Sequence, residues 1–262
     1  MSPAPSLDSV AARSAGPSVW EGLLRLIFPP ACAACGVGVP AGDFCERCRK
    51  RLLATAGALL CSRCGTGVGP FVDATNGCFA CRRERFAFTG VLRLGRYDDA
   101  LRSACLKMKH ERGRRLAVAL ADLFFEIRTG KIAALGIDAV VPVPLHWKRR
   151  AWRGYNQSAE VAERLAHRLR LPFHENLLRR TRPTPVQTNL SATKRRENVR
   201  NAFAPRRRLE GATVLLVDDV MTTGATCHYA AKALKEAGAS KVIAAILARR
   251  EDPRVSPALE EP

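Results

Sequence analysis

Residues 214–226 carry the side chains best suited to chemistry, and they read Val-Leu-Leu-Val-Asp-Asp-Val-Met-Thr-Thr-Gly-Ala-Thr. The apolar run predicts a buried strand that ends at Asp218 and Asp219, whose carboxylates can accept hydrogen bonds from a sugar diol. Backbone N–H groups at the start of the following helix, together with the Thr hydroxyls, suit a phosphate, and Gly224 lets the backbone approach it. The predicted phosphate-binding residues are Thr222, Thr223, Gly224, Ala225 and Thr226.

Two other interpretations fit part of this segment. Four apolar residues followed by Asp-Asp are also typical of a Walker B strand, but the chain has no G-x-x-x-x-G-K-[ST] sequence to hold a nucleotide. A purely structural strand end has no need for two adjacent carboxylates followed by Thr-Thr-Gly-Ala-Thr. A sugar phosphate site is therefore the better interpretation.

Eight of the ten cysteines form four Cys-x-x-Cys pairs: Cys32 and Cys35, Cys45 and Cys48, Cys61 and Cys64, and Cys78 and Cys81. Two such pairs supply four thiolates, which is the complete tetrahedral shell of a structural zinc ion, so the spacing predicts two Zn²⁺ ions. A disulfide framework is disfavoured in a reducing cytosol, whereas redox chemistry and an iron–sulfur cluster stay open as alternatives. Sequential pairing is the simplest arrangement, and an interleaved one stays open too.

From about Phe86 onward, apolar runs alternate with helical periodicity, which predicts an α/β domain with a mostly parallel sheet and flanking helices. The expected strands are 90–94, 139–143, 212–217 and 241–247, and the expected helices are 100–109, 114–128, 157–171 and 225–237. In such sheets ligands bind at the carboxyl ends of the strands, which is where Asp218 and Asp219 occur.

The chain is strongly basic, with a formal net charge of +19 and a pI near 10.3. Residues 148–208 alone hold 17 Lys and Arg against four Asp and Glu. Phosphates on a small ligand or on nucleic acid are the expected partners. The sequence upstream of Trp20 lacks the pattern of a secretory signal and no segment has the length of a membrane span, so we expect a cytoplasmic protein without stable membrane insertion.

Residues 214–226 resemble the phosphoribosyl pyrophosphate binding motif of type I phosphoribosyltransferases over their full length. The resemblance extends to the ComF competence family from Trp20 to Arg249. It rests on Pro29-Pro30, the four cysteine pairs, Lys109-His110, residues 141–145, Arg-Gly-Tyr-Asn-Gln at 153–157, residues 187–190, and Arg195 with Asn198.

This resemblance implies a double zinc ribbon followed by a phosphoribosyltransferase-like domain, and a role with internalised single-stranded DNA and the DNA-uptake machinery. The expected organisation is a disordered tail at 1–19, a zinc ribbon module at 20–84, a phosphoribosyltransferase-like domain at 85–250 and a second disordered tail at 251–262. The segment Trp20–Phe28 is compatible with one short amphipathic helix.

If the protein is a transferase, Asp218 and Asp219 bind the ribose hydroxyls of phosphoribosyl pyrophosphate, and Mg²⁺ neutralises the leaving pyrophosphate. Lys109, Arg153 and Asn156 are expected to bind the phosphates. The basic stretch 179–208 is interpreted as a mobile loop that closes over the ligand, or else as a solvated connector. The alternative is a non-catalytic nucleic-acid-binding competence accessory that uses the transferase fold as a ligand sensor, with Trp147, Trp152 and Tyr155 as stacking platforms.

Overall fold

The computed structural model describes residues 30–74, 77–110, 113–147, 151, 153–183 and 192–251. The chain divides into two compact units, residues 1–45 and 46–262. The expected tail at 1–19, the expected helix at 20–28 and residues 252–262 lie outside the described residues.

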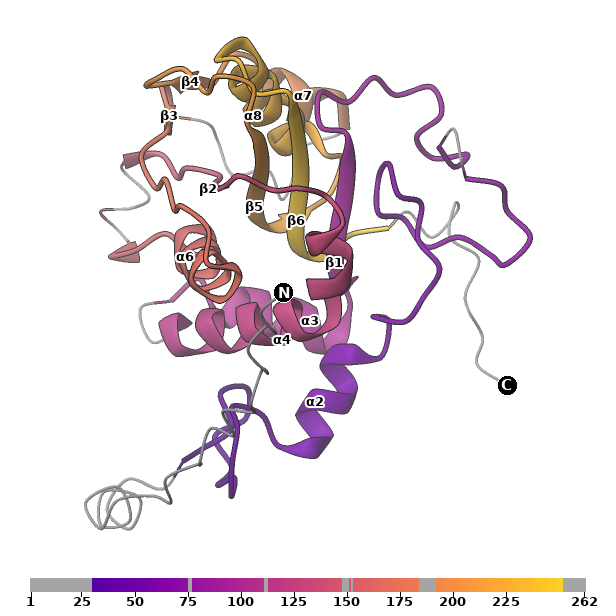
Figure 1. The fold of residues 1–262 in the computed structure, drawn as a ribbon. Coiled ribbons are helices and arrows are strands. Elements are labelled where there is room, and N and C mark those ends of the chain that lie inside the picture. The colour runs from indigo at the N-terminus through magenta and orange to yellow at the C-terminus, as the bar shows by residue number, and fades with distance from the viewer. Residues whose placement is uncertain are drawn as a thin grey trace, which may run out of the picture. The chain divides into compact units, whose positions relative to one another are not determined.

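The second unit is built on a four-stranded parallel sheet (Figure 1). Its strand order is β1-β6-β5-β2, and every neighbouring pair is parallel. The strands are β1 (Gly90–Arg96), β2 (Ala139–Pro142), β5 (Thr213–Met221) and β6 (Lys241–Arg249). The predicted α/β class is therefore confirmed, and all four predicted strands are present. Almost every residue of β5 and β6 is buried, as expected of central strands covered on both faces.

Helices cover both faces of this sheet. They are α3 (Asp99–Lys107), α4 (Arg114–Ala133), α6 (Gln157–Leu169) and α8 (Ala225–Glu236). Helix α4 packs on β1 and β6, α6 packs on β2 and β5, and α8 packs on β5 and β6. In Figure 1, α3, α4 and α6 lie together, apart from α8. Because all strands run in parallel, their carboxyl ends meet at one edge of the sheet, and β5 brings its two carboxylates to that edge.

Strand β5 is longer than its apolar run. The sequence predicts an end at Val217, but ladder pairing continues through Asp218 opposite Ile246 and as far as Met221 opposite Arg249. Both carboxylates therefore lie within the strand. Asp219 itself has no partner in the ladder register, because its N–H donates to the Asp218 carboxylate, and Val220 N–H donates to the Asp219 carboxylate.

The basic stretch 179–208 contains regular structure where the sequence predicted a loop. Strands β3 (Leu178–Arg180) and β4 (Phe203–Pro205) form an antiparallel pair, and α7 (Ala192–Val199) lies between them in the chain. Leu178 and Phe203 are buried and belong to the core that α8 shares with the sheet. Each strand has only three residues, and apolar residues are few among the many Arg residues of this stretch, so the sequence shows no periodicity that predicts the two strands. Residues 184–191 lie outside the description.

Gly113, directly before α4, holds the chain close to the end of α3. A Cβ atom there would lie 2.5 Å from the Lys107 carbonyl oxygen and 2.5 Å from the Met108 Cα. Its φ of −83° is available to any residue, so the constraint is steric. The close approach fixes the turn that carries Lys109.

We expect Gly113→Ala to lower the free energy of unfolding by about 1–3 kcal/mol, because two backbone segments must separate. Gly130→Ala is the control within α4, since a Cβ atom at Gly130 would meet nothing within 4 Å. This control should stabilise the protein by about 0.5–1 kcal/mol through helix propensity. Urea unfolding measures the free energy of unfolding of both variants. Equal effects of the two variants would contradict the steric assignment.

Candidate functional site

The eight paired cysteines gather into two clusters of four. One consists of Cys32, Cys35, Cys45 and Cys48, and the other of Cys61, Cys64, Cys78 and Cys81. Within each cluster all ligand atoms lie within 4.8 Å of one another. Sequential pairing is thus confirmed and the interleaved arrangement is wrong. We call the two clusters the first and the second zinc site.

The sulfur geometry fits zinc. In the second zinc site the Sγ–Sγ distances are 3.7 Å for Cys61 and Cys81 and 3.6 Å for Cys64 and Cys78. In the first, Cys35 and Cys45 lie 3.8 Å apart. A tetrahedral ion with Zn–S bonds of about 2.3 Å has ligand edges of about 3.8 Å. Each site offers four thiolates, which fill the shell of a structural ion.

Both sites use the same local turn. Gly36 N–H donates to the Cys32 carbonyl at 2.8 Å, and Gly65 N–H donates to the Cys61 carbonyl at 2.8 Å. Both glycines have positive φ, +80° and +72°, which favours glycine because other residues are strained there. The sequence Cys-x-x-Cys-Gly thus encodes one turn twice.

Asp218 and Asp219 are both buried, with 8% of each residue exposed. The Asp218 carboxylate accepts hydrogen bonds from Ser158 Oγ at 3.1 Å and from Asp219 N–H at 2.9 Å. The Asp219 carboxylate accepts one from Gln157 Nε2 at 3.1 Å and pairs with Lys109 Nζ at 3.5 Å. The start of α6 and the end of α3 therefore supply the groups that hold the acid pair.

Burial, and after it the neighbouring charge of Asp219, raise the pKa of Asp218 to about 8. The hydrogen bonds from Ser158 and from the Asp219 backbone oppose this shift. The pKa of Lys109 is raised chiefly by the carboxylate of Asp219, so the ammonium stays charged. A cation or hydrogen-bond donors from a ligand would therefore stabilise the ionised form of Asp218.

A cavity of about 230 Å³ opens at these residues. Lys109 and Arg153 line it, as predicted, and so do Asp218, Asp219 and the strand end at 143–145. Among the described residues, the buried Nε atom of Arg153 has no hydrogen-bond partner.

The predicted phosphate loop forms the start of α8. Gly224 is the N-cap, with φ of +79°, and a Cβ atom there would lie 3.2 Å from the Phe86 ring. Glycine is required on both grounds. Thr222, Gly224, Ala225 and Thr226 line the cavity. The Thr223 hydroxyl instead accepts a hydrogen bond from Ala225 N–H at 3.4 Å, which supports the turn.

Asn156, which the sequence predicted to bind a phosphate, is not among the residues that line the cavity. It is the N-cap of α6, where its Oδ1 accepts from Ser158 N–H at 3.1 Å and its Nδ2 donates to the Val143 carbonyl at 3.2 Å. An N-cap Asn satisfies the first N–H groups of a helix. Asn156 therefore orients Gln157 and Ser158, the two residues that bind the carboxylates and that sequence reasoning missed.

Sequence reasoning also missed part of the cavity wall. Tyr97, Arg180, Arg195 and Arg250 line it, from segments far apart in the chain. Arg195 was among the residues that carry the family resemblance, but the resemblance did not indicate that it lines the cavity. The other residues carry no local signal, because a single Arg in a basic chain is normally a solvated surface group.

Comparison with known proteins agrees with this architecture. Residues 154–258 match the phosphoribosyl transferase domain family and residues 23–84 match the double zinc ribbon domain family. DNA utilization protein YhgH of Salmonella typhimurium is 33% identical over 187 residues, which cover 70% of this chain and 81% of that protein. Its namesake in Escherichia coli K12 is 30% identical over 223 residues, covering 83% and 96%. Competence protein F of Haemophilus influenzae is 28% identical over 204 residues, covering 76% and 86%.

The chain belongs to the ComF family. The double zinc ribbon and the phosphoribosyltransferase domain of this ComF-family protein correspond to its two cysteine clusters and its parallel sheet. None of the helices in the described part of this ComF-family chain combines the length and the apolar character needed to cross a membrane.

The raised pKa of Asp218 makes stability depend on pH. Between the ordinary Asp pKa of about 4 and the folded value of about 8, the folded state binds the proton and the unfolded chain releases it. Stability therefore falls as pH rises through this window. Asp218→Asn removes the titration and keeps an oxygen acceptor for Ser158. The linkage amounts to about 3–4 kcal/mol between pH 5 and pH 8, so we expect its melting temperature to exceed the wild-type value by about 7–14 °C more at pH 8 than at pH 5.

Glu163→Gln, at an exposed position of α6, is the control and should show no such pH-dependent difference. Thermal unfolding by circular dichroism measures both variants. The assignment fails if the Asp218→Asn difference is the same at both pH values.

Proposed function

We propose that the cavity at the carboxyl end of β5 binds phosphoribosyl pyrophosphate with Mg²⁺, and that this ComF-family protein transfers the phosphoribosyl group to an acceptor. One observation carries the proposal: the buried pair Asp218 and Asp219 faces the same cavity as the start of α8. Sugar hydroxyls and a phosphate are the groups that these two features recognise.

The proposed ligand contacts follow from this geometry. The 5-phosphate is bound by the turn at 222–226, where the N-terminus of α8 favours negative charge. The ribose hydroxyls donate to Asp218 and Asp219. The pyrophosphate lies towards residues 143–145, where Lys109 and Arg153 supply positive charge.

The proposed reaction is displacement at the anomeric carbon. A nucleophilic acceptor forms a bond to C1 of the ribose, the bond from C1 to the pyrophosphate oxygen breaks, and pyrophosphate leaves with the electron pair. Mg²⁺, when bound, supplies charge neutralisation to the leaving group. Lys109 and Arg153 stabilise the charge that develops there, and the two carboxylates hold the ribose in position.

Isothermal titration of phosphoribosyl pyrophosphate into the zinc-loaded protein tests the site. We expect saturable binding that requires Mg²⁺. Lys109→Met should weaken it by about 10–100-fold, because it removes a charged hydrogen-bond donor. The control is Lys131→Met, an exposed residue of α4 with the same change of charge. An absence of binding, or equal weakening by the two variants, would remove the assignment.

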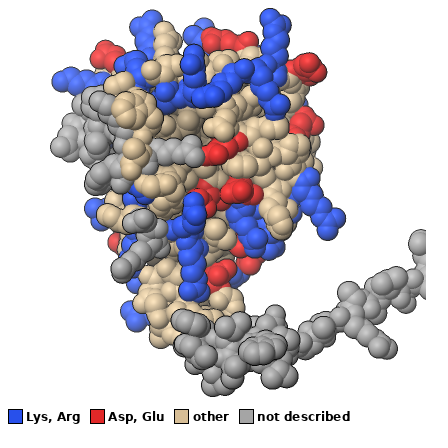
Figure 2. Space-filling view, turned by 90° about the vertical axis from the view of Figure 1, so that its left-hand side faces the viewer, with Lys and Arg blue, Asp and Glu red and all other residues tan. Residues whose placement is uncertain are grey.

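A second function, binding of single-stranded nucleic acid, is favoured by exposed aromatics on the second zinc ribbon. Phe71 and Phe79 are 99% and 73% exposed, and the Arg82 guanidinium lies 5.0 Å from the centroid of the Phe79 ring. Aromatic faces beside Arg are typical stacking platforms for bases. On the face drawn in Figure 2, Lys and Arg side chains are most frequent along the upper edge, with Asp and Glu side chains among and below them. The names of the relatives, DNA utilization protein and competence protein, agree with this function.

The three aromatic residues that the sequence predicted as stacking platforms differ in exposure. Trp147 is 66% exposed. Tyr155 is buried and its hydroxyl donates to the Met108 carbonyl, so it supports the turn before Lys109 and offers no face to a base. The side chain of Trp152 lies outside the described residues.

Fluorescence anisotropy with a labelled oligothymidine tests this function. Phe71→Ala and Phe79→Ala are each expected to weaken binding by about 5–100-fold, the effect of losing one stacked base. Leu59→Ala is the control, since Leu59 is 57% exposed on the same ribbon but is not aromatic. The wild-type affinity should fall steeply with salt. The platform is wrong if Leu59→Ala weakens binding as much as the Phe variants do.

A further inference from the structure

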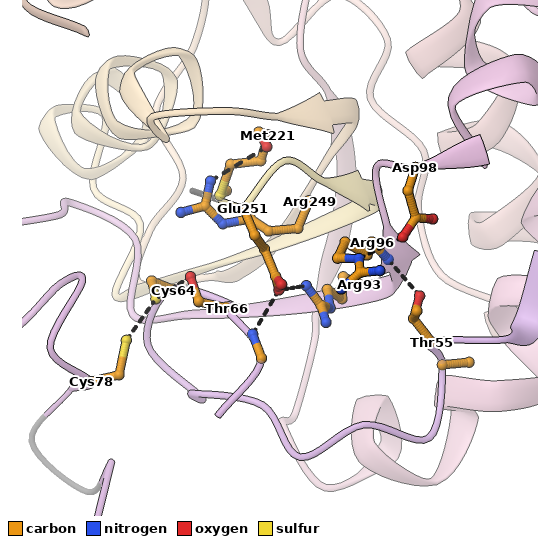
Figure 3. Close-up of polar contacts among 12 residues, drawn as sticks. Thr55, Cys64, Thr66, Cys78, Arg93, Arg96, Asp98, Met221, Arg249 and Glu251 are labelled. Atoms are coloured by element: carbon orange, nitrogen blue, oxygen red, sulfur yellow. Dashed lines mark hydrogen bonds and ion pairs between the residues drawn. The ribbon is translucent and has the colours of Figure 1, made fainter. Parts of the chain in front are cut away.

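Glu251 follows the last residues of β6 and is buried against the second zinc ribbon (Figure 3). Its side chain is 5% exposed and pairs with Arg93 of β1, whose side chain is 1% exposed. The same carboxylate oxygen accepts a hydrogen bond from Gly67 N–H at 2.7 Å. The sequence assigned Glu251 to a disordered tail, but three elements of the second unit meet at this carboxylate.

Gly67 belongs to the turn that carries the second zinc site. Cys64 is three residues before it, and the Cys64 Sγ lies 3.3 Å from the Thr66 hydroxyl. The same turn is seated on β1, because Val91 N–H donates to the Ser62 carbonyl at 2.9 Å. A rigid zinc turn therefore holds one side of Glu251.

Gly65 allows this close seating. A Cβ atom at Gly65 would lie 2.8 Å from Val91 Cγ1, so glycine is needed for the turn to reach β1. Its positive φ is required by the zinc turn as well. One residue thus satisfies both the metal site and its contact with the sheet.

The two residues before Glu251 hold the phosphate loop. Arg250 N–H donates to the Met221 carbonyl at 2.8 Å, and the Arg249 guanidinium donates to the Thr222 carbonyl. The Arg249 carbonyl accepts from Tyr97 N–H at 2.7 Å. Arg250 and Tyr97 both line the cavity. Residues 249–251 therefore connect the carboxyl ends of β1, β5 and β6.

We propose that Glu251 is a positioning residue that couples the second zinc site to the phosphate loop, so that zinc at Cys61, Cys64, Cys78 and Cys81 and a phosphate ligand at 222–226 stabilise each other. Release of Glu251 from Gly67 and Arg93 frees the end of β6, and the carbonyls of Met221 and Thr222 lose their fixed donors. Coupling of this kind is reciprocal, so the ligand also retains the zinc. The ligand part of this inference rests on the proposed function.

The first test needs no ligand. In zinc-loaded full-length protein, alkylation of each cysteine by N-ethylmaleimide is followed by peptide mass spectrometry, and amide hydrogen exchange is followed at residues 222–226. Glu251→Ala is expected to speed both alkylation at the second zinc site and exchange of the loop by at least about fivefold. Glu251→Gln keeps an oxygen acceptor for Gly67 and Arg93, so its rates should lie closer to the wild type.

Two controls separate coupling from general destabilisation. Asp122→Ala removes another carboxylate that is 14% exposed and pairs with Arg164 and Arg168 between α4 and α6. It should change neither rate. The first zinc site is an internal control, because the ribbon residue that contacts Glu251 is Gly67, three residues after Cys64 of the second zinc site. The inference is overturned if loop exchange is unchanged in both Glu251 variants, or if Asp122→Ala has the same effects.

The second test uses the wild type alone and so does not depend on a variant folding. Saturating phosphoribosyl pyrophosphate with Mg²⁺ should slow alkylation at the second zinc site at least about fivefold and leave the first unchanged. Equal protection of both sites, or none when calorimetry shows binding, overturns the coupling and leaves the ligand site standing. If calorimetry shows no binding, the proposed function fails, and loop exchange in Glu251→Gln and Glu251→Ala decides the coupling by itself.

Discussion

Two carboxylates buried side by side at the end of a parallel strand are the constraint around which the second unit is organised. Burial and mutual repulsion disfavour charge on both, and the raised pKa of Asp218 records that cost. The surrounding structure supplies compensating groups from three directions: Ser158 and Gln157 from the start of α6, Lys109 after α3, and backbone N–H groups of β5 itself. Strain of this kind persists in folded proteins mainly where a ligand uses it.

Much of the remaining architecture can be understood as support for this acid pair. Asn156 caps α6 and so directs the two residues that contact the carboxylates. Gly113 and the buried hydroxyl of Tyr155 fix the turn that carries Lys109. Such positioning residues touch no ligand, yet small displacements of the groups that they hold are costly in a site built on alignment.

The zinc ribbons solve a different problem. The segment from Pro30 to Glu84 has few large buried apolar residues, so metal binding supplies order that a hydrophobic core would otherwise provide. In the second ribbon, direct hydrogen bonds attach the zinc turn to the sheet. Val91 N–H of β1 donates to the Ser62 carbonyl of this turn, and Gly67 N–H of the turn donates to Glu251. The second cysteine cluster and the cavity thus lie at two ends of one short, continuous network that includes residues 249–251.

The sequence by itself determined the features that are local: the two sets of zinc ligands, the α/β class, the four parallel strands, and the carboxylates followed by the phosphate loop. Each depends on spacing or periodicity within a short window, such as Cys-x-x-Cys-Gly for one turn. The tertiary structure decided which distant groups meet there. It made Asn156 the cap of α6, placed Arg180, Arg195 and Arg250 in the cavity wall, and buried the Glu251 side chain against Arg93. The reason is physical: a polar side chain takes its role from the neighbours that packing brings to it, and those neighbours lie up to 184 positions away, as for Gly67 and Glu251.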